Sequence, residues 1–293
     1  MLVGRNVSSA LFFAVMVGCV LWDVFTRFHV FPILVFLVSS LAILEATALV
    51  RKTGAEMRPW RLGCWALVMM FVFDGWLGEM QHLHVIVIVG LMLLFVQAMT
   101  QPIRGGIGSV GTALMCSVWI GVGFGSILTL WSWDGPQGIS REGRYLIVFL
   151  MPVAMFQDIA AMWTGSLLGR RKLAPVLSPH KTVEGAIGGL LGSGLMGLVL
   201  WFIYSFFKDD TRGVPLCEFF TWWDALLLGL LFGGVGQLGD LSESLLKREA
   251  GVKDSGWTGT AHGGVLDVFD SLLFCAPTMA LYAWTRGLWM FSG

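Results

Sequence analysis

The sequence predicts an all-α, polytopic integral membrane protein, and composition is the first observation that predicts it. Of the 293 residues, 56% are hydrophobic and only 13% are charged, whereas about a quarter of the residues in a typical soluble domain are charged. The mean hydropathy is +0.76. The 38 glycines and 14 tryptophans are typical of helices that pack closely in lipid and end at its interface. A water-soluble fold would have too little polar surface to cover itself.

Hydrophobic runs of spanning length are the second observation. A membrane-spanning helix needs about 20 predominantly apolar residues. About nine segments come close to this requirement, and no alternating strand pattern or long polar stretch separates them. The candidate spans are 8–26, 30–50, 62–78, 83–100, 107–131, 145–168, 184–207, 222–240 and 265–288. We expect the first span to be retained, because it lacks a clear cleavage site and another span follows at once.

The distribution of basic residues is the third observation, and it predicts an orientation. With nine spans, 13 of the 19 lysines and arginines fall on one side of the membrane and six on the other. Loops rich in lysine and arginine stay in the cytoplasm. We therefore expect the amino terminus and the basic loops to be cytoplasmic, in the cell membrane, which is the inner membrane in a bacterium.

Charge and cysteine content exclude other classes of function. The 19 basic and 19 acidic residues balance to a net charge of zero, so no global field favours binding to nucleic acid. The five cysteines are scattered through apolar runs and show no CxxC or metal-type spacing. We interpret them as packing residues.

The polar residues divide the chain into two regions. Residues 1–144 form a hydrophobic multi-span region in which polar side chains such as Glu45, Asp74 and His82 are isolated. We expect neighbouring helices to satisfy most of them, although an acid inside a span is a weak sign of function. Residues 145–293 carry nearly all of the polar motifs. This second region is therefore expected to contain the functional site.

A basic segment follows the span at 145–168. Ser178 followed by Pro179 resembles a helix N-cap with proline at the first helical position, and Lys181 would lie in that first turn. The free N–H groups and the positive dipole of a helix start suit a phosphate group. Taken alone, the segment is equally well explained as a capped helix after a positively charged cytoplasmic loop.

A second polar cluster ends the span at 222–240. If the helix continues to residue 248, Asp240, Lys247 and either Glu243 or Ser244 lie on one face, because residues three, four and seven positions apart share a helix face. That face mixes acid, hydroxyl and base at the membrane boundary. A salt-bridged helix end is the alternative explanation.

Two more carboxylates enter the last span. Asp267 and Asp270 are three residues apart and therefore share a helix face. Acids at the head of a span are costly unless their charge is compensated, and carboxylate oxygens are hard ligands that suit Mg²⁺. Asp240 comes from the preceding span and is expected at the same depth as Asp267. A metal ion between them would lower the cost of burying both charges.

Four motifs, in this order, resemble the phosphatidate cytidylyltransferase family, also called the CDP-diacylglycerol synthases. They are Ser178-Pro-x-Lys-Thr182, Gly239-Asp-Leu-x-Glu-Ser244, Lys247-Arg-x4-Lys-Asp254 and His262-Gly-Gly-x-x-Asp267-x-x-Asp270. Upstream, Asp158-x-x-Ala161 is also similar to the family. Residues before Asp158 match only as a hydrophobic multi-span region. The family usually has an arginine directly after the first aspartate of its last motif, and here Val268 takes that place.

The resemblance implies a nucleotidyltransferase that makes CDP-diacylglycerol and pyrophosphate from CTP and phosphatidate in phospholipid biosynthesis. It implies Mg²⁺ as the cofactor, with K⁺ as a candidate second cation. The implied metal ligands are Asp240, Asp267, Asp270 and Glu243, and the implied catalytic residues are Asp240, Asp267, Lys181 and Lys247. The implied substrate-binding residues are Asp158, Ser178, Lys181, Thr182, Lys247, Arg248, Lys253, Asp254, His262, Gly263 and Gly264.

The implied partners are CTP, phosphatidate and the surrounding membrane lipid, and the site is expected on the cytoplasmic side. The glycine-rich run Gly185–Gly194 can pack within one subunit or across a homodimer. One rival is a CTP-dependent enzyme that acts on a polyprenyl or ether lipid, which assays with different acceptors would separate. The other rival is a transporter or channel. It is disfavoured because the polar groups cluster on one side and form no continuous stripe across the bilayer.

Overall fold

Helices form almost all of the structure. The computed structural model describes residues 14–20, 22, 30–53, 59–77, 80–100, 106–133, 142–206, 220–252 and 264–291. The long helices among them are α2 (Val30–Thr53), α3 (Arg61–Trp76), α4 (Leu83–Met99), α5 (Gly106–Ser132), α6 (Glu142–Leu168), α7 (Val183–Phe206), α8 (Trp222–Glu249) and α9 (Leu266–Phe291). The prediction of an all-α protein is confirmed apart from one small hairpin.

Six of these helices are long and apolar enough to cross a membrane. They are α2, α5, α6, α7, α8 and α9, and α4 is a shorter apolar helix of 17 residues. The helices α2 to α9 coincide with eight of the predicted spans, whereas the first predicted span, 8–26, lies mostly outside the described residues. This set of apolar helices supports the prediction that the chain is an integral membrane protein.

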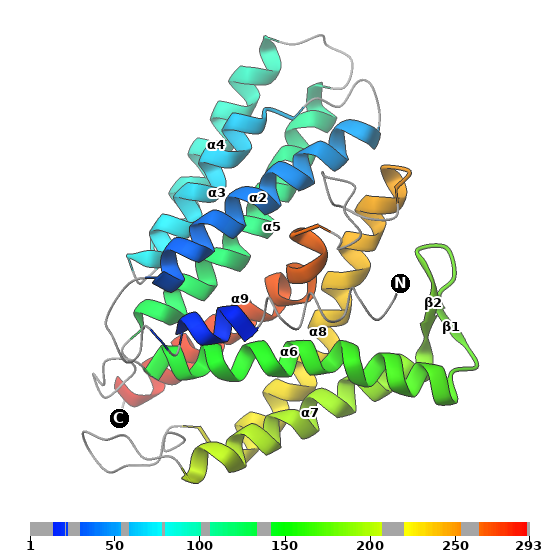
Figure 1. The fold of residues 1–293 in the computed structure, drawn as a ribbon. Helices are drawn as coiled ribbons and strands as arrows, with labels where there is room; N and C mark the ends of the chain where they lie inside the picture. The colour runs from blue at the N-terminus through cyan, green and yellow to red at the C-terminus, as the bar shows by residue number, and fades with distance from the viewer. Residues whose placement is uncertain are drawn as a thin grey trace.

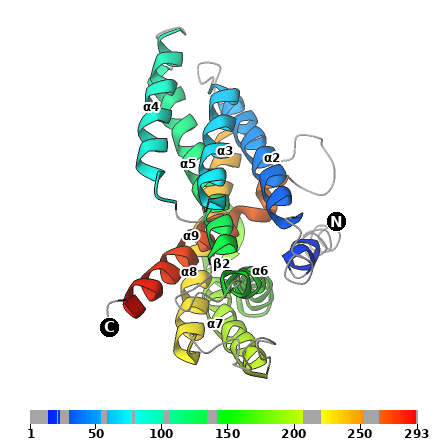
Figure 2. The same cartoon turned by 90° about the vertical axis from the view of Figure 1, so that its left-hand side faces the viewer.

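The helices form two groups that meet along α9. In one group α5 packs against α2, α3 and α4, and in the other α7 packs against α6 and α8. Figures 1 and 2 show that α6 runs crosswise to the long helices of the first group. Helix α9 contacts both α5 and α8. The aromatic ring of Phe124 on α5 lies 5.2 Å from that of Phe269 on α9, centroid to centroid, and both residues are fully buried.

Small residues allow the second group to pack closely. A Cβ atom at Gly188 of α7 would lie 2.0 Å from Thr164 Oγ1 of α6, and one at Gly197 would lie 2.4 Å from the Ala225 carbonyl oxygen of α8. Glycines at such positions let helix backbones approach each other in lipid. Within the run Gly185–Gly194, Gly188 therefore packs against a helix of the same chain.

A short antiparallel hairpin separates α6 from α7. It consists of β1 (Lys172–Ala174) and β2 (Ser178–Thr182), with Lys172 opposite Thr182 and Ala174 opposite Ser178. Figure 1 shows the hairpin projecting from the ends of these two helices. A two-stranded sheet tolerates Pro179 because each strand has one edge without ladder hydrogen bonds.

The hairpin corrects the predicted N-cap. Helix α7 begins at Val183 and not at Pro179. Thr182 makes the capping contact in place of Ser178: its Oγ1 accepts a hydrogen bond from the Gly185 N–H at 3.1 Å. The Glu184 carboxylate accepts hydrogen bonds from the backbone N–H groups of Arg170 (3.0 Å) and Arg171 (3.2 Å), which holds the start of the hairpin against the helix. These tertiary contacts override the local Ser-Pro signal.

Candidate functional site

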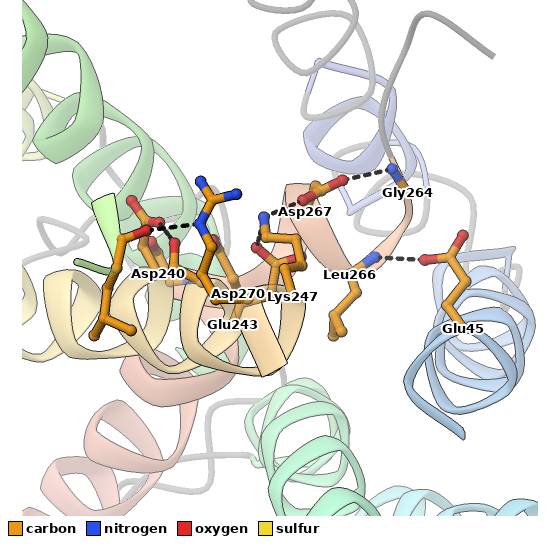
Figure 3. A network of polar contacts seen from close by, with 12 residues as sticks. Glu45, Asp240, Glu243, Lys247, Gly264, Leu266, Asp267 and Asp270 are labelled. Atoms are coloured by element: carbon orange, nitrogen blue, oxygen red, sulfur yellow. Dashed lines mark hydrogen bonds and ion pairs between the residues drawn. The ribbon is translucent and has the colours of Figure 1, made fainter. Parts of the chain in front are cut away.

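Polar side chains from α6, α8, α9 and β2 gather in one region of the molecule, and Figure 3 shows those of α8 and α9. Helix α8 continues through residue 249, as the sequence predicted, so Asp240 and Lys247 both lie on its last turns. Helix α9 begins at Leu266, which places Asp267 in its first turn and Asp270 one turn further on. The site is therefore built at the end of one helix and the start of the next.

Lys247 lies between two acids. Its ammonium group donates a hydrogen bond to Asp267 Oδ1 at 2.5 Å and forms an ion pair with Glu243 one helical turn away. Glu243 is completely buried and Lys247 is 7% exposed. The second oxygen of Asp267, Oδ2, accepts a hydrogen bond from the Gly264 N–H at 2.8 Å (Figure 3). Buried charges of this kind are tolerated only when they are paired and hydrogen-bonded.

Asp240 lies one turn before Glu243 and has a different partner. Its carboxylate forms an ion pair with Lys181 of β2, and the two side chains are both a quarter exposed. The Ser244 hydroxyl lies 3.5 Å from Asp240 Oδ1. The hairpin therefore places Lys181 beside the last turns of α8. This contact brings the Ser178–Thr182 motif next to the end of α8.

Helices α6, α8 and α9 each contribute one carboxylate to the same region of the molecule. Asp158, Asp240 and Asp270 interact by charge, and Lys181 is the cation that acts on Asp158. Asp158 is exposed at the molecular surface, whereas Asp270 is 7% exposed and accepts a hydrogen bond from the Ser271 N–H at 2.5 Å. Like charges repel each other, and Lys181 offsets part of this repulsion.

Two uncommitted oxygen atoms lie next to this trio. Gln157 Oε1 and Ser271 Oγ are buried and have no hydrogen-bond partner among the described residues. Both residues border Gly236, where a Cβ atom would meet Gln157 Oε1 at 3.1 Å and Ser271 Cβ at 3.5 Å. Buried polar atoms usually have partners. Carboxylate, amide and hydroxyl oxygens together make a hard donor set of the kind that Mg²⁺ prefers.

The predicted metal ligands fall into two neighbouring groups. Asp240 and Asp270 share the carboxylate trio with Asp158, whereas Asp267 and Glu243 are bound to Lys247. Across the described ranges, no three His, Cys, Asp or Glu side chains already converge as a metal-binding group. In this structure Lys247 pairs with the Asp267 carboxylate and Lys181 pairs with the Asp240 carboxylate, so a metal site at Asp240 and Asp267 stays a prediction.

Comparison with known protein families identifies the family of the chain that carries this site. A model of the cytidylyltransferase family matches residues 8–285, which is nearly the whole chain. The chain belongs to the cytidylyltransferase family. The match includes the first helices as well as the four motifs, so the family extends beyond the region from Asp158 onward that the sequence motifs covered.

Several bacterial relatives are named phosphatidate cytidylyltransferase. The protein of Staphylococcus saprophyticus is 34% identical over 215 residues, covering 73% of this chain and 74% of the relative. The protein of Staphylococcus haemolyticus is 37% identical over 166 residues, covering 57% and 56%. That of Staphylococcus aureus strain COL is 40% identical over 138 residues, covering 47% of this chain and 48% of the relative.

The remaining predicted residues of this cytidylyltransferase are distributed around the site. Arg248 donates from Nε to the Leu177 carbonyl oxygen at 3.0 Å, which joins the end of α8 to the hairpin turn. Ser178 lies half-buried in β2, and Thr182 caps α7. Four predicted residues lie outside the described part of the chain: Lys253, Asp254, His262 and Gly263.

Val268 takes the place of an arginine that the family usually has. It is half-buried and packs against the apolar core. One position after Asp267, its side chain leaves the helix in a direction away from the face that Asp267 and Asp270 share. The substitution therefore leaves the two acids of this cytidylyltransferase unaltered.

Sequence reasoning missed one contact to the site. Glu45 of α2 was expected to be an isolated polar residue, yet its Oε2 accepts a hydrogen bond from the Leu266 N–H at 3.0 Å (Figure 3). The two residues are 221 positions apart in the chain. An acid within an apolar span was the available signal, but nothing in the local sequence identified its partner.

Proposed function

We propose that the chain transfers the cytidylyl group of CTP to phosphatidate, producing CDP-diacylglycerol and pyrophosphate. The observation that carries the proposal is the ion pair of Lys181 from the hairpin with Asp240, beside the Lys247–Asp267 pair that joins α8 to α9, in a member of the cytidylyltransferase family. Relatives that are 34–40% identical to the chain over aligned stretches of 138–215 residues carry the name of this enzyme. The chain is accordingly a nucleotidyltransferase.

The reaction needs charge neutralisation more than a strong base. A phosphate oxygen of phosphatidate attacks the α-phosphorus of CTP, a new P–O bond forms, and the bond to the bridging oxygen of the departing pyrophosphate breaks. The attacking oxygen is already anionic at neutral pH. Catalysis therefore consists of aligning two polyanions and offsetting their repulsion, as in other phosphoryl and nucleotidyl transfers.

The basic residues of the site are the proposed phosphate contacts. Lys181 and Arg248 lie where the hairpin meets the end of α8, and an Arg fork or a Lys ammonium suits phosphate oxygens. Lys247 holds Asp267 and Glu243 in place. Hydroxyl and backbone donors complete the proposed substrate site: Ser178, Thr182 and Gly264, together with the motif residues Lys253, Asp254, His262 and Gly263.

Mg²⁺ is the proposed cofactor, with K⁺ as a candidate companion. The uncommitted oxygens of Gln157 and Ser271 beside the carboxylate trio fit a hard cation. We propose Asp240, Asp267, Asp270 and Glu243 as the residues that would hold it, with Asp158 as a substrate-binding residue beside them. When bound, the metal ion neutralises charge on the triphosphate and polarises its phosphorus–oxygen bonds.

We further propose an orientation in which the amino terminus and the site are cytoplasmic, with nine spans in total. The supporting observations are the excess of basic residues in the loops of that side and the position of the site at the end of α8 and the start of α9. CTP is a cytoplasmic nucleotide, and the headgroup of phosphatidate lies at the membrane interface. Residues 145–293 would carry the chemistry in this arrangement.

The decisive experiment is an assay of purified protein with labelled CTP, phosphatidate and Mg²⁺, scored for labelled CDP-diacylglycerol. Parallel reactions replace phosphatidate with a polyprenyl phosphate or an ether-linked phosphatidate. Product with phosphatidate supports the proposal. Turnover only with another acceptor would reassign the lipid substrate, and absence of any CTP turnover would refute the proposal.

A further inference from the structure

We infer that Glu45 is a positioning residue for the active site: from α2 it anchors the first turn of α9 and thereby sets the position of Asp267 against Lys247. The inference deepens the proposed function and depends on it for its activity readout. It gives the amino-terminal multi-span region a part in the chemistry beyond that of a membrane anchor.

The carboxylate of Glu45 accepts a hydrogen bond from the backbone at the start of α9. Glu45 is 9% exposed, and its Oε2 lies 3.0 Å from the amide nitrogen of Leu266, the first residue of α9. The first N–H groups of a helix have no partner within the helix, so Glu45 caps α9 from a different helix.

The helix start also provides the charge compensation that a buried acid needs. The N-terminal end of a helix carries a partial positive charge that stabilises nearby carboxylates. Here it compensates two acids, because Asp267 Oδ2 accepts from the Gly264 N–H at 2.8 Å on the same first turn. The negative charges of Glu45 and Asp267 repel each other. Burying the Glu45 carboxylate therefore costs less energy when the positively polarised start of α9 lies between the two acids.

The anchored turn leads directly to the catalytic groups. Leu266, which Glu45 binds, precedes Asp267, whose Oδ1 lies 2.5 Å from Lys247 Nζ. Because Leu266 is the first residue of α9, the contact from α2 fixes the start of that helix. A shift of about 1 Å in a supporting element can alter catalysis by a hundredfold.

Three substitutions at position 45 separate the effect of side-chain length from the effect of charge. Glu45→Gln keeps the length and an oxygen acceptor for the Leu266 N–H but removes the charge. Glu45→Asp keeps the charge but is one methylene too short to span the same gap. Glu45→Ala removes both. The control is Thr47→Val on the same helix, because Thr47 is buried and its hydroxyl bonds only to carbonyl groups of α2 itself, at Ile43 and Leu44.

Two measurements are made on each variant of the full-length protein. The first is kcat and KM for CTP and phosphatidate. The second is hydrogen–deuterium exchange of the Leu266 amide, which reports the anchor whether or not the protein turns over CTP. We expect Glu45→Ala and Glu45→Asp to lose about tenfold in kcat, the effect of losing one hydrogen bond, with KM within about twofold. We expect their Leu266 amide to exchange about tenfold faster, and Glu45→Gln and Thr47→Val to stay close to the native protein.

The opposite ranking, with Glu45→Asp active and Glu45→Gln inactive, would overturn the inference, because it would mean that the charge itself acts on the substrate or a metal ion. Unchanged Leu266 exchange in Glu45→Ala would also overturn it, as would faster exchange with native kcat. If Glu45→Ala does not fold, Glu45→Gln and Glu45→Asp decide between these outcomes. If the native protein makes no CDP-diacylglycerol, the proposed function fails, and the exchange data still test whether Glu45 anchors α9.

Discussion

The ammonium group of Lys247 lies 2.5 Å from Asp267 Oδ1, and this contact joins the last turns of α8 to the first turn of α9. Because Lys247 also pairs with the fully buried Glu243, one cation serves two acids from two helices. The pairing keeps Asp267 beside the carboxylate trio formed by Asp158, Asp240 and Asp270. Stability and site geometry therefore depend on the same lysine.

Lys247→Met is expected to destabilise the protein strongly. The substitution keeps most of the side-chain volume but leaves two buried carboxylates without their cation, and breaking a buried pair in this way costs about 3–5 kcal/mol. Thermal unfolding in detergent measures the effect. The double substitution Lys247→Met with Glu243→Gln should recover part of the loss, and Lys172→Met, at an exposed position, serves as the control. Native stability in Lys247→Met would show that the pairing contributes nothing.

Asp240→Asn is expected to lower CDP-diacylglycerol synthesis by about a hundredfold or more while the protein still folds, because the amide keeps the shape and loses an anionic ligand whose role in charge stabilisation is worth several kcal/mol. Turnover per folded protein, measured against Mg²⁺ concentration, tests this. The matched control is Asp224→Asn at the other end of α8, where Asp224 pairs with Arg286. Near-native turnover of Asp240→Asn at all Mg²⁺ concentrations would remove Asp240 from the site.

Gly229→Ala is expected to destabilise the packing of α7 on α8. A Cβ atom at Gly229 would lie 2.5 Å from the Ser193 carbonyl oxygen and 2.8 Å from Gly194 Cα, both of which are backbone atoms. Overpacking of this kind costs about 1–3 kcal/mol. Gly234→Ala on the same helix is the control, because its Cβ atom would meet nothing within 4 Å and alanine favours the helix. Equal melting temperatures for the two variants would contradict the close packing.

Cysteines at Val176 and Gln81 test the proposed orientation. Val176 is 86% exposed in the hairpin turn, and Gln81 is exposed between α3 and α4. With the basic loops cytoplasmic, an impermeant thiol reagent added to intact cells should label Val176→Cys only after the cells are opened, and Gln81→Cys without opening. The unsubstituted protein is the control for its own cysteines. The reverse pattern would place the site on the side of the membrane that lacks CTP.

Local sequence was sufficient for most elements and for part of the site. The apolar runs that predicted helices over 30–50 and 107–131 correspond to α2 and α5, because a helix in lipid must satisfy its own backbone hydrogen bonds and apolar length alone identifies it. The spacing of Asp240 and Lys247 was interpreted correctly as one helix continuing past the span. The start of α7 was misplaced, because Ser178 and Pro179 have the residue types of an N-cap but pair as a strand with β1.

By itself, the sequence determined the membrane class, the helical segments and the residues of the four motifs, since these follow from composition and from spacing along one helix. Only the tertiary structure decided which charges meet. In the folded chain Lys181 pairs with Asp240, and Lys247 pairs with Asp267. Glu45 accepts a hydrogen bond at the start of α9. These partners come from different helices or from the hairpin, and their proximity depends on how the helices pack. No periodicity within a single segment records that packing, because each contact depends on the placement of two elements at once.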